Sequence, residues 1–220
     1  MINIDPEVMK QTKEMFGQMK DEVEVLLFVA GEKDHHCLYC SETRSLVELV
    51  AEQSPLIKVK TCECSIDSPE AKEYNIDKHP AIIIKSKHVK GAVRFFGIPA
   101  GYEFGSLIEG IIDASTGNID ISENTQKVLM QVNEANPLHL QVFVTPTCPY
   151  CPMMVRLAHK FAMINPHIKG DCVEAMEFRD LSMKYNVMGV PRTIINETES
   201  LEGAAPEPLF LKKIEEALKK

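Results

Sequence analysis

Apolar runs and amphipathic stretches alternate along this chain in an order that occurs twice. The runs at 23–29 and 138–144 are rich in Val, Leu and Phe, as strands buried on both faces of a sheet are. A helix is predicted before each run, over 6–20 and over 123–134. The pattern therefore predicts two units, each opening with a helix and a buried strand.

Each opening strand is followed by the same series of predicted elements. The series is an amphipathic helix, a second strand, a short helix, a strand that begins after a proline, an edge strand and a closing helix. The predicted bounds are 57–66 and 171–178 for the second strands, 81–85 and 192–195 for the strands after proline, and 102–114 and 207–218 for the closing helices. This order predicts the α/β class, with a mixed β-sheet flanked by helices in each unit.

A constant offset of 111 residues relates the two units. It joins the CxxC motif that begins at Cys37 to the one that begins at Cys148. The same offset joins Glu63 to Glu174, Tyr74 to Tyr185, Pro80 to Pro191 and Ile83 to Ile194. Because the Gly- and Asn-containing segment 115–120 breaks the helical pattern, we predict one unit over residues 1–118 and the other over 119–220.

Composition and charge exclude several classes of protein. The 220 residues, 45% hydrophobic and 25% charged, suit an ordinary globular chain and exclude a disordered or fibrous one. A net charge of -8 without a basic cluster argues against a nucleic-acid partner. The start of the chain lacks the pattern of a signal peptide, and no apolar run could span a membrane. We therefore expect a cytoplasmic protein with no membrane partner.

The two CxxC motifs suit thiol–disulfide exchange. The reaction needs an accessible thiolate and a second thiol that resolves the mixed disulfide. Cysteines three positions apart on the first turn of a helix share one face and can bond, and the helix N-terminus lowers the pKa of the first thiol. We therefore predict Cys37 and Cys148 as nucleophiles, with Cys40 and Cys151 as the resolving thiols.

Longer motifs around these cysteines resemble a known family. The motifs are Phe-Phe-Gly-Ile-Pro-Ala-Gly at 95–101, Thr-Pro-Thr-Cys-Pro-Tyr-Cys-Pro at 145–152 and Tyr-Asn-Val-Met-Gly-Val-Pro at 185–191. In tandem, they resemble the glutaredoxin-like protein disulfide oxidoreductases of archaea and thermophilic bacteria, within the thioredoxin/glutaredoxin superfamily. The resemblance implies two tandem thioredoxin-fold units with thiol–disulfide exchange at each CxxC, and electrons supplied by a flavin-containing thioredoxin reductase. We expect no bound cofactor and no metal, and the redox-active groups are the disulfides.

The same resemblance assigns a role to Pro80 and Pro191. In the superfamily a cis proline faces the CxxC pair, and the residue before it offers backbone N–H and C=O groups to an extended substrate. The resemblance therefore implies cis bonds at both prolines and substrate contacts from His79, Pro80, Val190 and Pro191. The imidazole of His79 either alters substrate choice or is simply solvated.

The residues around the cysteines predict different redox potentials for the two sites. Pro149 presets the backbone for the start of a helix, whereas Leu38 in the first motif does not. A protonated His36 would favour the thiolate of Cys37 and make the first site more oxidising. The alternative for His36 is a solvated loop without effect on the thiol.

Two departures from the wider superfamily concern proton transfer and glutathione. Thioredoxins usually hold a buried Asp beneath the CxxC, but the strands at 25–29 and 140–144 carry none. Glu63 and Glu174 are candidates for the proton relay if a central strand desolvates them; otherwise they lie at strand ends and face water. The Gly-Gly turn of glutaredoxins is replaced at 201–206, which weakens the case for glutathione as the reductant.

Three cysteines lie outside the CxxC motifs. Cys62 and Cys64 alternate along one strand, and Cys172 lies one register position away in the second unit. We expect all three to pack in the core, where Cys is common. A zinc site made from Cys62, Cys64 and the first CxxC pair is the alternative, although it would consume that pair.

Three functions fit these features. The first is an enzyme that reduces, oxidises or isomerises protein disulfides through both CxxC sites. The second is an electron carrier that passes electrons from a flavin thioredoxin reductase to a peroxidase such as a peroxiredoxin. The third is a redox-inactive scaffold that uses the fold only to bind peptides. Two CxxC pairs, each with a proline in register, favour the first function.

Overall fold

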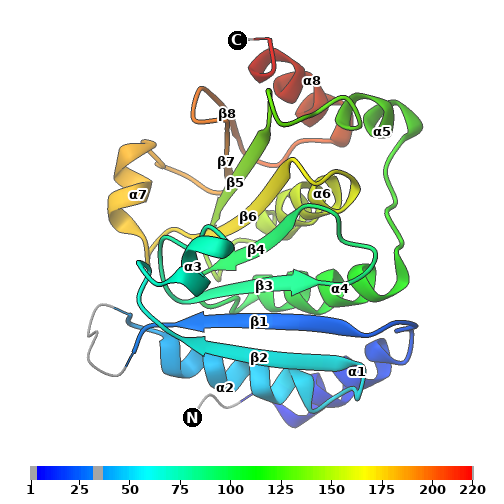
Figure 1. The fold of residues 1–220 in the computed structure, drawn as a ribbon, viewed down its shortest axis with the longest axis vertical. Coiled ribbons are helices and arrows are strands. Elements are labelled where there is room, and N and C mark those ends of the chain that lie inside the picture. The colour runs from blue at the N-terminus through cyan, green and yellow to red at the C-terminus, as the bar shows by residue number, and fades with distance from the viewer. Residues whose placement is uncertain (1–3, 32–36, 220) are drawn as a thin grey trace.

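The computed structural model describes residues 4–31 and 37–219 (Figure 1). Helices and strands follow each other in the same order in two halves. The strands are β1 (Val23–Val29), β2 (Ile57–Glu63), β3 (Ala81–Lys85), β4 (Ala92–Phe96), β5 (Leu138–Val144), β6 (Ile168–Glu174), β7 (Arg192–Ile195) and β8 (Glu199–Glu202). The helices are α1 (Pro6–Phe16), α2 (Cys40–Ala51), α3 (Pro69–Glu73), α4 (Tyr102–Thr116), α5 (Glu123–Leu129), α6 (Cys151–Ile164), α7 (Arg179–Lys184) and α8 (Glu207–Ala217).

In the described part of the chain, eight strands form one mixed sheet in the order β2-β1-β3-β4-β6-β5-β7-β8. Each half contributes a parallel pair, β1 with β2 and β5 with β6, and then two antiparallel strands. This arrangement confirms the α/β class with two thioredoxin-like halves. The division between residues 118 and 119 stays a prediction.

The prediction that β4 is an edge strand was wrong. β4 pairs in parallel with β6, so that Arg94 lies opposite Asp171. Two conditions allow this pairing. The two charged side chains neutralise each other, and Gly91 permits a close approach, because a Cβ atom there would lie 2.3 Å from the Ile168 carbonyl oxygen. The two halves therefore share one sheet.

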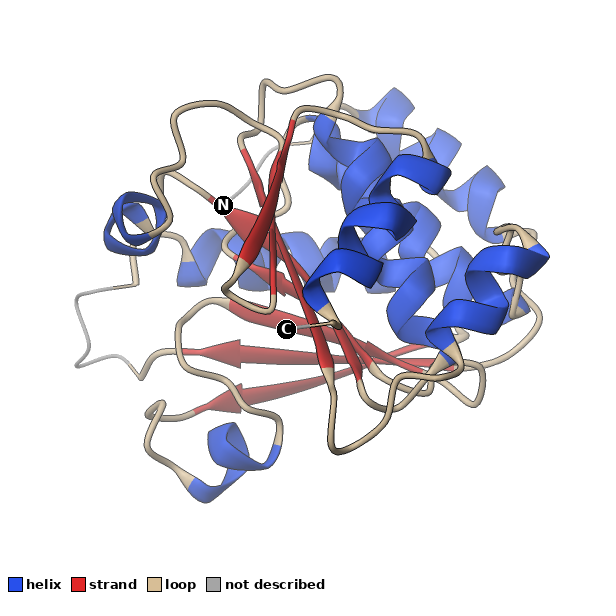
Figure 2. Ribbon diagram, turned by 90° about the horizontal axis from the view of Figure 1, so that it is seen from above, coloured by secondary structure: helices blue, strands red, loops and turns tan. Residues whose placement is uncertain are grey.

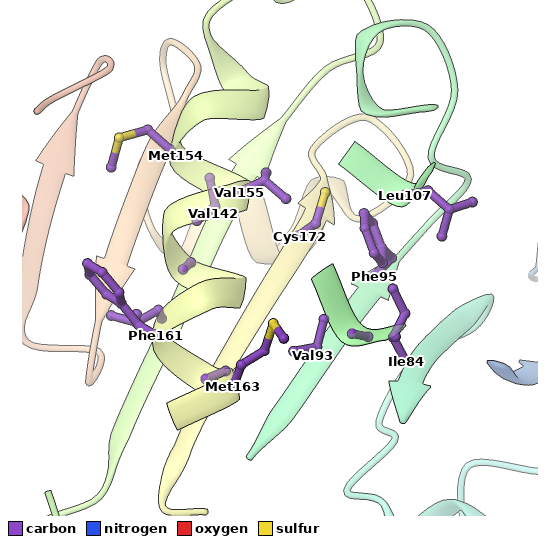
Figure 3. Packing of buried hydrophobic residues seen from close by; sticks show 14 of the residues in the cluster. Ile84, Val93, Phe95, Leu107, Val142, Met154, Val155, Phe161, Met163 and Cys172 are labelled. Carbon is purple, nitrogen blue, oxygen red and sulfur yellow. The ribbon is translucent and has the colours of Figure 1, made fainter. Parts of the chain in front are cut away.

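Apolar side chains fill both faces of the sheet, with helices on each side (Figure 2). In β1, Val25 and Leu27 join a large core under α1, α2, α4, α5, α6 and α8, while Leu26 and Phe28 join a smaller core with α3 and α7. Figure 3 shows the middle of the large core, where Cys172 lies beside a phenylalanine of β4. No helix in the described ranges has the length and apolar character that crossing a membrane requires.

The predicted bounds of β1, β3, β5 and β7 are those observed. β6 spans Ile168–Glu174 and not the predicted 171–178. It begins three residues early because Ile168 already pairs with β5 and Lys169 pairs with both β4 and β5. β2 ends at Glu63, before the predicted position. α1 and α5 also end earlier than predicted, at Phe16 and Leu129.

Candidate active site

Both CxxC motifs lie where a buried strand leads into a helix. The cysteines form the disulfides Cys37–Cys40 and Cys148–Cys151, with Cα–Cα distances of 5.6 and 5.5 Å. The prediction that both cysteines lie on the first helical turn was only half correct, since α2 begins at Cys40 and α6 begins at Cys151. The first thiol of each pair therefore precedes the helix N-terminus, where unpaired N–H groups carry partial positive charge.

The two disulfides differ in exposure. Cys37 and Cys40 are half-buried, and the Ala30 N–H donates to Cys40 Sγ at 3.2 Å. Cys148 is 7% exposed and Cys151 is fully buried. An attacking thiolate therefore reaches the first site more easily than the second in this oxidised state.

The peptide bonds before Pro80 and Pro191 are cis, which confirms the prediction from the superfamily. Each proline precedes a pair of antiparallel strands, β3 and β4 or β7 and β8, and its carbonyl accepts a hydrogen bond from the N–H of the glycine that follows this pair. Gly97 donates to Pro80 at 3.0 Å, and Gly203 donates to Pro191 at 2.8 Å. The two halves thus build the same turn around their prolines.

The residues before the two prolines have different surroundings. His79 and Cys37 line one pocket of about 230 Å³. Val190 packs against the large apolar core, which includes Cys148 and Cys151. Pro149 is exposed in the turn before α6. His36 lies outside the described residues.

Glu63 and Glu174 occupy different environments despite their matching positions in the sequence. β2 is an edge strand, and the Glu63 side chain there is 40% exposed and pairs with Arg44 at 2.8 Å. β6 is a central strand, where Glu174 is buried and burial raises its pKa. The desolvation expected of a central strand therefore applies to Glu174 and not to Glu63.

Glu103 is a buried carboxyl that had no signal in the sequence. It is the second residue of α4, is 2% exposed, and its carboxyl oxygens make no hydrogen bond of regular geometry to any described residue. Burial raises the pKa of Glu103 to about 7, although the nearby Ser106 hydroxyl acts to lower it. An acidic residue in the first turn of a helix is ordinarily explained by the helix dipole, so its burial could not be predicted.

Glu177, just after β6, is a half-buried carboxyl that also had no signal in the sequence. Burial raises its pKa to about 7; a hydrogen bond from the Ile98 N–H acts to lower the pKa, and the nearby charge of Glu174 adds to the increase. Glu177 lines the same pocket as Cys37 and His79. The second half of the chain therefore contributes a carboxyl to the first site.

The segment 97–101 connects the two sites. The Ile98 N–H donates to the Glu177 carboxyl at 2.6 Å, beside the first site. Just after the segment, the Tyr102 N–H donates at 3.0 Å to the carbonyl of Pro146, which lies two residues before Cys148. Gly101 has φ +59° and a Cβ there would lie 2.1 Å from the Pro146 oxygen, so the close approach requires glycine. The first half therefore supports the turn that carries the second CxxC.

The core packing expected of the other three cysteines is confirmed for Cys172 and only in part for Cys62 and Cys64, which are half-buried. Cys172 is buried in the large core, and burial raises the pKa of its thiol. Cys62 and Cys64 pack against the smaller core, and burial, together with Cys64, raises the pKa of Cys62 to about 12. Among the described residues, no group of His, Cys, Asp and Glu side chains is arranged to hold a metal ion.

These environments predict that the thiols outside the CxxC motifs react much more slowly than the thiol of Cys37. We expect iodoacetamide at pH 8 to leave Cys62 and Cys172 almost unmodified in the native protein, since only a thiolate reacts and the pKa of both thiols is raised. After reduction with dithiothreitol, Cys37 should become the most rapidly modified residue. Peptide mapping by mass spectrometry measures both results, and rapid native labelling of Cys172 would contradict its burial.

Comparison with known proteins supports a thiol-based chemistry. A thioredoxin domain model matches residues 138–216. The structure is similar to that of a protein disulfide oxidoreductase from Aeropyrum pernix K1, with a TM-score of 0.88 and 30% identity over 100% of this chain and 95% of that chain. It also resembles the NTD_N/C domain of alkylhydroperoxide reductase AhpF from Enterococcus faecalis V583, with a TM-score of 0.80 and 24% identity over 98% and 100% of the two chains. At that identity the second likeness shows the fold alone.

Sequence relatives include a longer protein. The chain is 24% identical over 200 residues to the alkyl hydroperoxide reductase AhpF of Staphylococcus aureus (strain Mu50), which covers 90% of this chain and 35% of that relative. The chain thus spans little more than a third of that relative. The similarity to the Aeropyrum pernix structure extends over nearly the full length of both chains. With its two thioredoxin-like halves and a CxxC disulfide in each, the chain belongs to the protein disulfide oxidoreductase family.

Proposed function

We propose that this protein reduces, oxidises or isomerises the disulfides of other proteins at both of its CxxC sites. The proposal is carried by one repeated arrangement, a CxxC disulfide at a helix N-terminus in the same half as a cis proline. A thiolate at the helix N-terminus attacks a substrate disulfide, and the neighbouring thiol resolves the mixed disulfide. The net direction follows from the reduction potentials of the sites and their partners.

Each site has a division of roles in this proposal. Cys37 and Cys148 are the nucleophiles, and Cys40 and Cys151 resolve the mixed disulfides. The half-buried Cys40 already accepts a hydrogen bond from a backbone N–H, which favours its thiolate form as a leaving group. The buried Cys151 lacks exposure to solvent, so its proton must leave through the protein.

Substrate binding falls to the backbone around the cis prolines. His79 and Pro80 serve the first site, and Val190 and Pro191 serve the second. An extended substrate segment would pair with the backbone of the residue before each proline. His79 lines the pocket beside Cys37, and this shared pocket supports its assignment to the substrate.

The remaining candidates tune the two sites. Pro149 presets the turn before α6, and His36 would stabilise a thiolate at Cys37 if protonated. Glu174 is the better relay candidate of the matched pair because it is buried on a central strand. Glu63, paired with Arg44, would act on the charge around the first disulfide.

The proposal also includes the redox partners of the protein. Electrons would come from a flavoprotein thioredoxin reductase, and substrates would be proteins with accessible disulfides. A dedicated electron carrier to a peroxidase such as a peroxiredoxin is the second candidate. The similarity to the staphylococcal alkyl hydroperoxide reductase AhpF over 90% of this chain favours it. A carrier would be reduced rapidly by one partner and would turn over insulin poorly.

Insulin reduction by single-cysteine variants tests the proposal. We expect both Cys37→Ser and Cys148→Ser to retain part of the turnover. Although the oxidised first pair is more exposed, the larger loss is expected in Cys148→Ser, because the stretch from Phe143 to Cys148 is four residues shorter than that from Phe28 to Cys37 and Pro149 presets the start of the helix. The double variant should be inactive. Precipitation of the insulin B chain measures the rate. An unchanged rate in the double variant would refute the proposal. If neither CxxC pair could be converted between its dithiol and disulfide forms, the peptide-binding scaffold would be favoured instead.

A further inference from the structure

The pocket beside the first disulfide is built by both halves of the chain. It has a volume of about 230 Å³ and is lined by Cys37, Leu38 and His79 from the first half and by Glu177 and Phe178 from the second. A substrate thiol would attack the Sγ atom of Cys37, and His79 directly precedes the cis Pro80. The opening in which substrate meets sulfur thus contains a carboxyl from the other half.

The carboxyl of Glu177 is held in a fixed place. Its Oε1 accepts a hydrogen bond from the Ile98 N–H at 2.6 Å, and its own backbone N–H donates to Glu174 Oε2 at 2.6 Å. Only one carboxyl oxygen is engaged by the Ile98 N–H. A carboxylate has lone pairs on both oxygens, so Glu177 keeps acceptor capacity for a second donor.

Partial burial, more than the surrounding charges, decides when this carboxyl is ionised. Burial raises the pKa of Glu177 to about 7, the Ile98 N–H acts to lower it, and the charge of Glu174 raises it further. Charged or titratable groups face it from β6 and from the pocket wall: Cys172, Glu174, Asp77, Lys78 and His79. Arg179, at the start of α7, acts on the neighbouring Glu174. A base whose pKa lies near the working pH is the most effective in proton transfer.

We propose that Glu177 is the proton acceptor for the substrate thiol that enters the Cys37–Cys40 site. This inference rests on the proposed function and adds a residue from the opposite half to the first site. It also gives the sheet shared by the two halves a functional role, because the pairing of β4 with β6 brings the turn after β6 close to the first disulfide.

The chemical step is the oxidation of a substrate dithiol. Glu177 takes the proton from the first substrate thiol, and the resulting thiolate attacks Cys37 Sγ. The new S–S bond forms as the Cys37–Cys40 bond breaks, and Cys40 leaves as a thiolate. The second substrate thiol then attacks the substrate sulfur of the mixed disulfide, which releases Cys37. The substrate loses two electrons, the protein pair gains them, and the two protons end on protein or water.

The size of the effect follows from thiol ionisation. A thiol with a pKa of about 8.5 is only about 3% ionised at pH 7, so a base that removes its proton can accelerate the attack by at most about thirtyfold. We expect Glu177→Gln to slow the reaction at pH 7 by about tenfold, within that limit. The glutamine carbonyl can still accept the Ile98 hydrogen bond, so the fold of the segment is retained.

The test uses the full chain with Cys148→Ser and Cys151→Ser, so that the first pair reacts alone. Stopped-flow fluorescence follows oxidation of a dithiol peptide between pH 5 and pH 9. With Glu177 present, the rate should rise with a midpoint near pH 7. With Glu177→Gln, it should rise only with the ionisation of the peptide thiol, at higher pH. A structural defect would lower the rate without moving the midpoint.

Asp180→Asn is the matched control, since this exposed residue on α7 also loses a negative charge three positions away. Its rate and pH profile should equal those of the parent. Identical pH profiles for the parent and Glu177→Gln would overturn the inference while leaving the proposed function intact. No exchange at all at the Cys37–Cys40 pair of the parent would instead refute the proposed function for this site.

Discussion

Replacing Arg94 by methionine is expected to lower the free energy of unfolding by about 3–5 kcal/mol, the usual cost of removing one member of a buried ion pair. The methionine fills most of the space of the arginine side chain, so little of the loss comes from a cavity. Asp171, whose side chain is 1% exposed, would keep its negative charge in the interior. The destabilisation therefore measures the ion pair at the seam between the halves.

The geometry of this ion pair explains the size of the effect. Arg94 Nε and Nη2 each donate to one carboxylate oxygen of Asp171 at 2.8 Å, and the remaining Nη1 donates to the backbone carbonyls of Tyr74 and Asn75. His139 Nε2 lies 2.6 Å from Asp171 Oδ2. Burial acts to raise the pKa of Asp171, but the charges of Arg94 and His139 hold it well below its usual range.

Urea unfolding followed by circular dichroism measures the loss, with a double variant as the control. In Arg94→Met with Asp171→Leu, neither charge remains, and most of the stability should return, because a buried ion pair can be replaced by apolar groups at little cost. If Arg94→Met alone cost less than about 1 kcal/mol, as an exposed ion pair does, the pair would not be what joins the halves.

The sequence predicted the parts of this fold that depend on local pattern. β1 and β5 are rich in Val, Leu and Phe, and β3 and β7 follow prolines, so the local sequence marks where these strands lie. The CxxC disulfides and the cis prolines were predictable for a related reason. Their spacing repeats in two copies, and the same two features define the superfamily.

The parts that could not be predicted depend on contacts between distant segments. Arg94 and Asp171 are charged residues of the kind found at exposed strand edges, and only their pairing across β4 and β6 makes them suitable for burial. Glu103 and Glu177 look like solvated residues of a helix start and a turn. The segment 97–101 folds against the second half, which buries Glu103 and half-buries Glu177, and no local pattern encodes that contact.

Replacing Glu103 by glutamine is expected to raise the free energy of unfolding at pH 8 by about 3 kcal/mol. Burial raises the pKa of Glu103 from 4.5 to about 7, and each tenfold change in proton affinity corresponds to about 1.4 kcal/mol. The ionised carboxyl therefore destabilises the folded state at pH 8. Glutamine has nearly the same shape and carries no charge, so it removes this cost.

The gain must depend on pH in a defined direction. Between about pH 4.5 and pH 7, Glu103 holds a proton in the folded protein that the unfolded chain has released, so the stability that it contributes is complete at low pH and falls as pH rises. The advantage of Glu103→Gln should accordingly be small at pH 5 and large at pH 8. Glu177 acts in the same direction and leaves some pH dependence in the variant.

Guanidinium unfolding at pH 5 and pH 8 separates this charge effect from a change in packing. Glu123→Gln is the matched control, because Glu123 also lies in the first turn of a helix but its side chain is 89% exposed. This control should change stability by less than about 0.5 kcal/mol at either pH. An equal gain for Glu103→Gln at both pH values would contradict the account, since a packing effect does not depend on pH. A gain confined to high pH would show that the fold keeps an ionisable carboxyl at the expense of stability, in a cavity bounded by Pro146 and Cys172 next to the second CxxC turn.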